Sequence, residues 1–166
     1  MSIGRFFRHL FSDFWSVRRA FPPDVMAAIE REIGAQEKRH NGELRFAVEA
    51  SLPLIDLVSG VSGRERAIEL FSRLRVWDTE QNTGVLIYLL LADRNVEIVA
   101  DRGIHLKVGE AGWEAICTEM EGEFARGAFQ QGVMRGVQAI SALLATHCPP
   151  RPDNPDELSN RPVIVD

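Results

Sequence analysis

Cysteine is scarce in this sequence: Cys117 and Cys148 are its only thiols, and their spacing matches no CxxC motif. The four histidines are equally scattered and form no metal-ligand spacing, which argues against a structural zinc site. Two isolated thiols are also too few for a disulfide framework. The sequence therefore predicts free cysteines and a reducing compartment.

Long apolar runs are lacking as well. No stretch approaches the roughly 20 apolar residues that a membrane-spanning helix needs. The first 21 residues, MSIGRFFRHLFSDFWSVRRAF, do not form a standard signal peptide, because charges interrupt each apolar stretch and no A-x-A cleavage site follows. The sequence predicts a cytoplasmic protein that can lie peripherally on the inner membrane.

The chain has no excess of positive charge. Its formal net charge is −5 at pH 7, whereas binding to a phosphate backbone requires a basic surface, so no nucleic acid partner is expected. It also contains no GxSxG nucleophile motif and no Walker loop. Its 166 residues suit one domain with short extensions. We place an N-terminal helix at 1–21, the domain at 22–147 and a proline-rich tail at 148–166.

The first 21 residues have an amphipathic pattern that predicts one helix. Bulky apolar residues recur near helical spacing, and arginines lie mostly off that stripe. The residues expected to face a membrane or a partner are Phe6, Phe7, Phe11, Phe14 and Trp15, together with Arg5, Arg8, Arg18 and Arg19. Such a helix can lie in the interface of an anionic membrane, pack on its own domain, or form a dimer. The pattern alone leaves these alternatives, and the oligomeric state, open.

The next stretch has the alternating helices and strands of an α/β domain. We expect a helix over 24–39 with Val25, Ile29 and Ile33 buried, and strands over 44–50, 84–91 and 96–100. Between the first two strands, Ser62 and Glu65 form a capping box that opens another helix. The core side of that helix is expected to consist of Ala67, Ile68, Phe71 and Leu74.

The order of these elements predicts the architecture. A strand, a helix and a second strand give a right-handed parallel crossover, and the third strand returns as a hairpin. Two further helices, over the region 110–146, complete a three-layer α/β/α sandwich with a small mixed sheet. Residues 51–61 and 103–109 are expected to be loops. The proline-rich end is expected to be weakly ordered, with 162–166 either frayed or docked as a strand.

Acidic and amide side chains are expected to meet at one rim of this sheet. The loop 78–82 precedes the second strand, Asp101 follows the third, and Glu43 lies near the start of the first. Carboxylate and amide oxygens gathered in this way can bind a hard divalent cation, although a solvated acidic loop has the same composition. Asp93 and Arg94, at the opposite end, are interpreted as turn residues.

These stretches together resemble the TPM-domain family. Residues 78–103, DTEQNTGVLIYLLLADRNVEIVADRG, are similar to the core of that family, and 122–140, GEFARGAFQQGVMRGVQAI, to its last helix pair. The resemblance covers about 22–146 and implies an α/β/α sandwich. Relatives include thylakoid-lumen proteins linked to photosystem II repair and many bacterial proteins. Some are described as acid phosphatases and others as calcium binders.

The resemblance assigns a calcium-type site to the loops that carry Asp78, Glu80, Asn82 and Asp101. The neighbours of that site would be Arg102, His105, Glu110 and Glu43. His105 stands where the family has a glutamate, and Arg102 brings a cation into a cation site. These departures favour a non-enzymatic or weakly active domain that binds a partner or a membrane surface. The alternative is a metal-dependent, acid phosphatase-like hydrolase that uses Asp78, Glu80 and Asp101.

Overall fold

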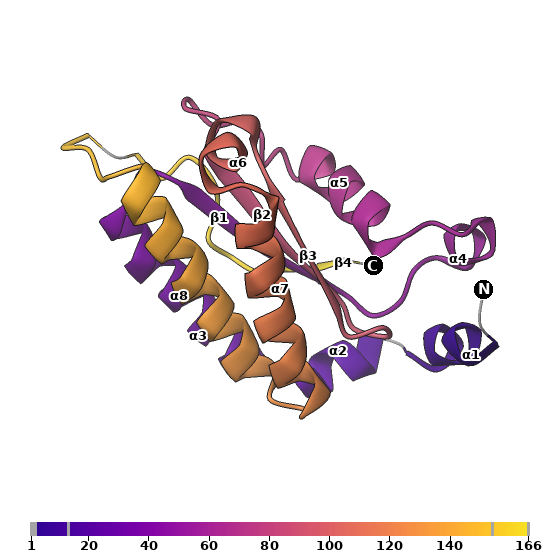
Figure 1. Cartoon of the computed structure of the whole chain (residues 1–166). Coiled ribbons are helices and arrows are strands. Elements are labelled where there is room, and N and C mark those ends of the chain that lie inside the picture. Colours follow the sequence, from indigo (N-terminus) through magenta and orange to yellow (C-terminus); the bar gives the residue numbers. More distant parts are fainter. Residues whose placement is uncertain (1–2, 13, 154, 166) are drawn as a thin grey trace.

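The computed structural model describes residues 3–12, 14–153 and 155–165 (Figure 1). The N-terminal half holds the elements α1 (Ile3–Phe11), α2 (Phe14–Ala20), α3 (Pro23–Gln36), the 3-10 turn η1 (Glu37–Arg39), β1 (Glu43–Glu49), α4 (Leu54–Ser59) and α5 (Gly63–Arg73). The C-terminal half holds β2 (Gly84–Leu90), β3 (Asn95–Ala100), α6 (Arg102–Val108), α7 (Glu110–Ala125), α8 (Phe129–His147) and β4 (Val163–Val165).

The strands form one mixed sheet in the order β3-β2-β1-β4. β1 runs parallel to β2, with Glu43 opposite Gly84, and β3 returns antiparallel to β2. Helices α3, α7 and α8 cover one face of the sheet, and α5 covers the other (Figure 1). The predicted three-layer sandwich is therefore confirmed.

Strand alternation divides the core into two layers. Leu44, Phe46 and Val48 point to the face covered by α3, where Ile29 and Ile33 are also fully buried, as predicted. The intervening side chains point to the α5 face. Every residue of β2 is buried, which confirms that its continuous apolar run is a strand covered on both sides.

Several short helices differ from the prediction. The expected single N-terminal helix is two helices, α1 and α2, because α1 ends at Phe11 and Ser12 is not helical; residue 13 lies outside the described residues. Helices α4 and α6 occupy two predicted loops. Gly60, with a φ of 81°, terminates α4, and the Asp101 carboxylate accepts the first N–H of α6. Helices of six and seven residues contain fewer than two turns, so an amphipathic pattern cannot repeat often enough to be recognised, and their caps were the only signal in the sequence.

The buried face of α5 also differs. Its capping box is present as predicted, but Ile68 is 49% exposed and Arg66 is 5% exposed. The helix turns Arg66 toward the sheet because this side chain donates to the buried carboxylate of Glu49. The same carboxylate accepts the Tyr88 hydroxyl.

The C-terminal tail adds a strand to the sheet instead of fraying. Val163 and Val165 of β4 pair with Ala47 and Glu49 of β1 in parallel register. A strand edge offers unpaired N–H and C=O groups, and a short β-branched segment can satisfy them. The tail consequently passes over the rim where β1 begins.

No helix in the described ranges is long and apolar enough to cross a bilayer.

Candidate functional site

The predicted acidic rim comes together at the backbone level. The Asp101 N–H donates to the Gly84 carbonyl at 2.8 Å, which holds the end of β3 against the start of β2. A β-carbon on Gly103 would lie 2.6 Å from the Asn82 carbonyl oxygen, so only glycine allows the first turn of α6 to pack on the loop 78–82. The loops therefore converge as the topology predicts.

The side chains of the four predicted ligands do not form one group in the structure. Asp78, Glu80 and Asn82 are exposed. The Glu80 carboxylate lies 3.5 Å from the guanidinium of Arg151 in the tail, and Asp101 caps α6 with a hydrogen bond of 2.6 Å from the first helical N–H. A surface ion pair and a helix cap account for two of these carboxylates.

The predicted neighbours are spread over three elements. Arg102 and Glu110 are exposed, at the first positions of α6 and α7, and His105 is half-buried on α6. Glu43 is different, because it is 3% exposed at the beginning of β1. It also joins a carboxylate group that the sequence did not predict.

This acidic group consists of Glu37 on η1, Glu43 on β1 and Asp156 in the tail. Their ligand oxygens lie within 4.8 Å of one another, and no other set of three metal-ligating side chains of this kind occurs among the described residues. Glu37 Oε1 accepts the Leu44 N–H at 2.9 Å, and Glu43 Oε2 accepts the Leu158 N–H at 3.1 Å. Sequence reasoning missed Glu37 because the turn from η1 into β1 places its carboxylate near Glu43, and it missed Asp156 because only the return of the tail brings that residue there.

Burial dominates the electrostatics of this group. It raises the pKa of Glu37 to about 8, although the Leu44 N–H opposes the shift, and the nearby Glu43 and Asp156 carboxylates add to it. Burial likewise raises the pKa of Glu43. At neutral pH the group therefore retains a proton, or it could exchange that proton for a divalent cation, for which carboxylate oxygens are suitable ligands.

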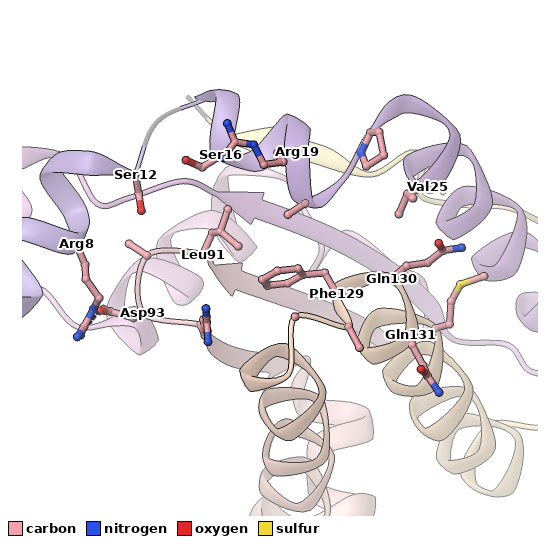
Figure 2. A pocket seen from close by; sticks show the side chains of 17 residues that line it. Arg8, Ser12, Ser16, Arg19, Val25, Leu91, Asp93, Phe129, Gln130 and Gln131 are labelled. Atoms are coloured by element: carbon pink, nitrogen blue, oxygen red, sulfur yellow. Dashed lines mark hydrogen bonds and ion pairs between the residues drawn. The ribbon is translucent and has the colours of Figure 1, made fainter.

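A second feature lies at the opposite end of the sheet, where α1, α2, the β2–β3 turn and the start of α8 surround a cleft of about 1440 Å³ (Figure 2). Figure 2 shows Arg8 and Asp93 at one end of this cleft, Gln130 and Gln131 toward the other, and the ring of Phe129 between them. Arginines from three different elements line it, namely Arg8, Arg19 and Arg94. Sequence analysis did not predict the cleft, because its lining residues lie up to 126 positions apart in the chain, from Arg8 to Met134.

Asp93 joins the N-terminal helices to the hairpin turn. Arg5 Nε donates to its carboxylate at 2.8 Å, an Arg8 guanidinium nitrogen lies at 3.3 Å, and His9 Nε2 lies at 3.1 Å. Burial alone would raise the pKa of Asp93, but the hydrogen bonds from Arg5 and His9 outweigh it and hold that pKa below its ordinary value. The residue interpreted as turn chemistry is therefore also the anchor of α1.

The anchored helices leave a large apolar surface uncovered. The exposed fractions are 50% for Phe7, 58% for Leu10, 77% for Phe11, 39% for Phe14 and 69% for Trp15. Phe6 packs on the core instead, and Val17 and Phe21 are buried. The neighbouring α4 adds Leu54, Ile55 and Val58, at 59%, 75% and 65% exposure. We call this set of eight exposed side chains the apolar surface.

Comparisons with known proteins agree with the fold and the resemblance. The family model described as TPM domain matches residues 18–143. The NMR structure of the BA42 protein from the psychrophilic bacterium Bizionia argentinensis is similar, with a TM-score of 0.72 and 28% sequence identity. That match covers 86% of this chain and 93% of the BA42 chain. No curated protein sequence matches. Because the family model spans most of the sequence, this chain belongs to the TPM-domain family.

Proposed function

We propose that this protein is an accessory factor that docks on an anionic membrane surface through α1 and α2. The observation that carries the proposal is the apolar surface itself. Single exposed apolar residues are ordinary, but exposed aromatic side chains in two contacting pairs, Phe7–Phe11 and Phe14–Trp15, on two consecutive helices are typical of an interaction site.

The charges around this surface favour lipid as the partner. The first 21 residues hold four arginines and one acidic residue, whereas the whole chain has a net charge of −5. Arg8, Arg18 and Arg19 are exposed beside the aromatic residues. Aromatic and aliphatic side chains enter the headgroup boundary, while arginines next to them attract anionic lipid.

The attachment of the helices to the domain supports the same conclusion. His9 Nδ1 accepts the Leu52 N–H at 3.1 Å, and Phe21 packs on Phe46 with ring centroids 5.6 Å apart. Docking would consequently hold the sheet domain at a fixed position on the membrane rather than on a flexible tether.

The first test is co-sedimentation of the full chain with phosphatidylcholine vesicles in which about 30% of the lipid is the anionic phosphatidylglycerol. Replacing both Phe11 and Trp15 with serine is expected to lower the partition coefficient at least about tenfold, because each exposed aromatic side chain loses about 1.5–3 kcal/mol of burial in the interface. Leu106→Ser is the matched control, since Leu106 is also 77% exposed but lies on α6.

Equal, negligible pelleting of the wild-type protein and both variants would contradict membrane docking. Light scattering on the same samples separates the other alternative. A dimer that the Phe11/Trp15 double variant converts to a monomer would indicate that the apolar surface joins two copies of this chain.

We further propose that the Glu37–Glu43–Asp156 group binds a divalent cation. Three carboxylates from separate segments, two of them with raised pKa values, repel one another, and a cation would relieve that repulsion. A metal-dependent phosphatase centred on Asp78, Glu80 and Asp101 is less well supported, since Asp78 and Glu80 are exposed and Asp101 serves as a helix cap.

Calcium titration of metal-stripped protein, followed by backbone amide NMR, tests this second proposal. We expect the largest shifts at the Leu44 and Leu158 amides, because these N–H groups donate to Glu37 and Glu43. Glu43→Gln should abolish them. Shifts confined to 78–82 and 101–110 would instead support the site expected from the sequence, and no shifts at millimolar calcium would contradict both.

A further inference from the structure

The cleft beneath α1 and α2 has the charge of an anion-binding site. Three arginines and one aspartate are its only charged lining residues among those described, which gives the lining a net charge of +2. The aspartate, Asp93, is already engaged by Arg5, Arg8 and His9. Arg19 is exposed on α2, and no described side chain forms an ion pair with it. Among the described residues, the Arg94 side chain donates only to the Ala125 carbonyl, at 3.3 Å, so the positive charges of Arg19 and Arg94 are left without a counter-ion there.

The start of α8 provides a second, independent source of positive potential. This helix is 19 residues long, its N-cap is Ala128, and neither a capping side chain nor an acidic residue is present in its first turn. The first N–H groups of a helix have no partner within the helix, and alanine cannot supply the missing acceptor. Gln130 and Gln131 line the cleft, so these N–H groups lie at its wall. An anion bound there would take the place of the missing cap.

The cleft also has apolar lining residues, and these distinguish among anions. Val25, Leu91, Phe129 and Met134 line the cleft next to the arginines. A free inorganic anion would leave this part of the cleft in contact with water. A ligand with a charged phosphate, a glycerol unit and the first methylene groups of an acyl chain would cover it.

Residues that line the cleft alternate along α1 and α2 with residues of the apolar surface. Each of three strongly exposed aromatic residues directly precedes a residue that lines the cleft; the pairs are Phe7 and Arg8, Phe11 and Ser12, and Trp15 and Ser16. Consecutive residues of a helix lie about 100° apart around its axis, so the membrane-facing stripe and the cleft-facing stripe are adjacent. A lipid at the surface on which α1 and α2 dock would have its headgroup near the cleft.

We infer that the cleft between α2, the β2–β3 turn and the start of α8 binds the phosphate of an anionic lipid headgroup, with Arg19, Arg94 and the first amides of α8 as its ligands. This inference rests on the proposed membrane docking and specifies its lipid class: a phosphodiester lipid without a balancing positive charge in the headgroup.

The vesicle arm of the test compares two charge-matched double variants of the full chain. Arg19→Gln with Arg94→Gln removes the cleft arginines, whereas Arg31→Gln with Arg75→Gln removes two exposed arginines that lie neither in the cleft nor on α1 and α2. On vesicles containing 30% phosphatidylglycerol, as above, we expect the first variant to bind about fivefold more weakly than the second. On pure phosphatidylcholine the two should bind alike.

The soluble arm uses glycerophosphoglycerol, the headgroup fragment of phosphatidylglycerol, and inorganic phosphate, each titrated separately and followed by amide NMR. We expect the fragment to shift the amides of 129–132, the Arg19/Arg94 variant to lose these shifts, and inorganic phosphate to shift them less. Stronger shifts with inorganic phosphate would overturn lipid as the source of the anion.

Equal vesicle binding by the two charge-matched variants would overturn the inference about the cleft. The membrane-docking proposal would still stand if the Phe11/Trp15 variant fails to bind vesicles. Shifts with the fragment in a protein that binds no vesicles would have the opposite meaning: the docking proposal would fail, and the cleft would be a site for a soluble phosphate compound rather than for lipid.

Discussion

Replacing Arg66 with methionine is expected to lower the free energy of unfolding by about 3–5 kcal/mol, because it leaves a buried carboxylate without its counter-ion. Arg66 contacts both oxygens of Glu49, at 3.0 and 2.7 Å, and the two side chains are 6% and 3% exposed. The Tyr88 hydroxyl donates to the same carboxylate at 2.6 Å. Burial raises the pKa of the Tyr88 phenol, so the hydroxyl remains a donor, but one neutral hydrogen bond cannot replace the charge of Arg66.

Urea denaturation followed by circular dichroism measures this effect. Arg73→Met is the matched control on the same helix: its side chain is 57% exposed and lies 3.7 Å from Glu69, and exposed pairs of this kind contribute less than about 1 kcal/mol. Replacing Glu49, Arg66 and Tyr88 together with methionine, methionine and phenylalanine should restore most of the loss, since no buried charge then remains. A loss below about 1 kcal/mol for Arg66→Met would mean that water reaches Glu49.

Between pH 6.5 and 8 the free energy of unfolding is expected to fall by about 2 kcal/mol, mainly through Glu37. The pKa of this carboxyl is about 8 in the folded protein and 4.5 without the effects of the fold. In that interval the folded state holds a proton that the unfolded state has released, so raising the pH favours unfolding, by about 1.4 kcal/mol for each pH unit. The buried Glu43, whose pKa is also raised, acts in the same direction.

His40 has the opposite effect at lower pH. Burial lowers its pKa from 6.5 to about 4, so the unfolded state binds the additional proton below pH 6.5 and stability decreases as the solution becomes more acidic. Between pH 4.5 and 6.5 the two residues change the free energy of unfolding in opposite directions. Above pH 6.5, of the two, only Glu37 still changes it with pH.

Urea titrations at a series of pH values test this prediction. Glu37→Gln should reduce the slope above pH 6.5, whereas Glu30→Gln, which removes an exposed carboxylate from α3, should leave it unchanged. An identical slope in the wild-type protein and the Glu37→Gln variant would show that Glu37 is ionised in the folded state. Calcium, if it binds Glu37 and Glu43, should stabilise the protein most at the upper end of this pH range, where the smallest fraction of Glu37 is protonated.

Local patterns in the sequence were sufficient for the long elements. β2 has a continuous apolar run, α3 places Val25, Ile29 and Ile33 on one face, and Ser62 caps α5 through Glu65 as predicted. In each case the signal lies within one element and reflects which face is buried or where a helix begins. The family motifs, 78–103 and 122–140, lie in β2, β3, α7 and α8, which are also elements with local signals, so the fold and the family follow from the sequence together.

The choice of face on α5 depended on contacts between elements. The pattern of α5 predicts that Ile68 faces the core, but the structure buries Arg66, because the buried Glu49 carboxylate on β1 requires a counter-ion in addition to the Tyr88 hydroxyl. Such a requirement becomes visible only when the strands are placed in register. The tail is similar, since the Val163–Val165 segment pairs with an edge of β1 that no local pattern identifies.

The sequence by itself determined the sandwich, its main strands and helices, and the convergence of the loops 78–82 and 101–103 at one rim. It could also identify the amphipathic aromatic segment, but not which of its side chains remain exposed. The tertiary structure alone decided that the carboxylates which meet are Glu37, Glu43 and Asp156, and that Arg19, Arg94 and the start of α8 share a cleft. Both sites join residues that are distant along the chain, and side-chain periodicity contains no information about which distant residues come together.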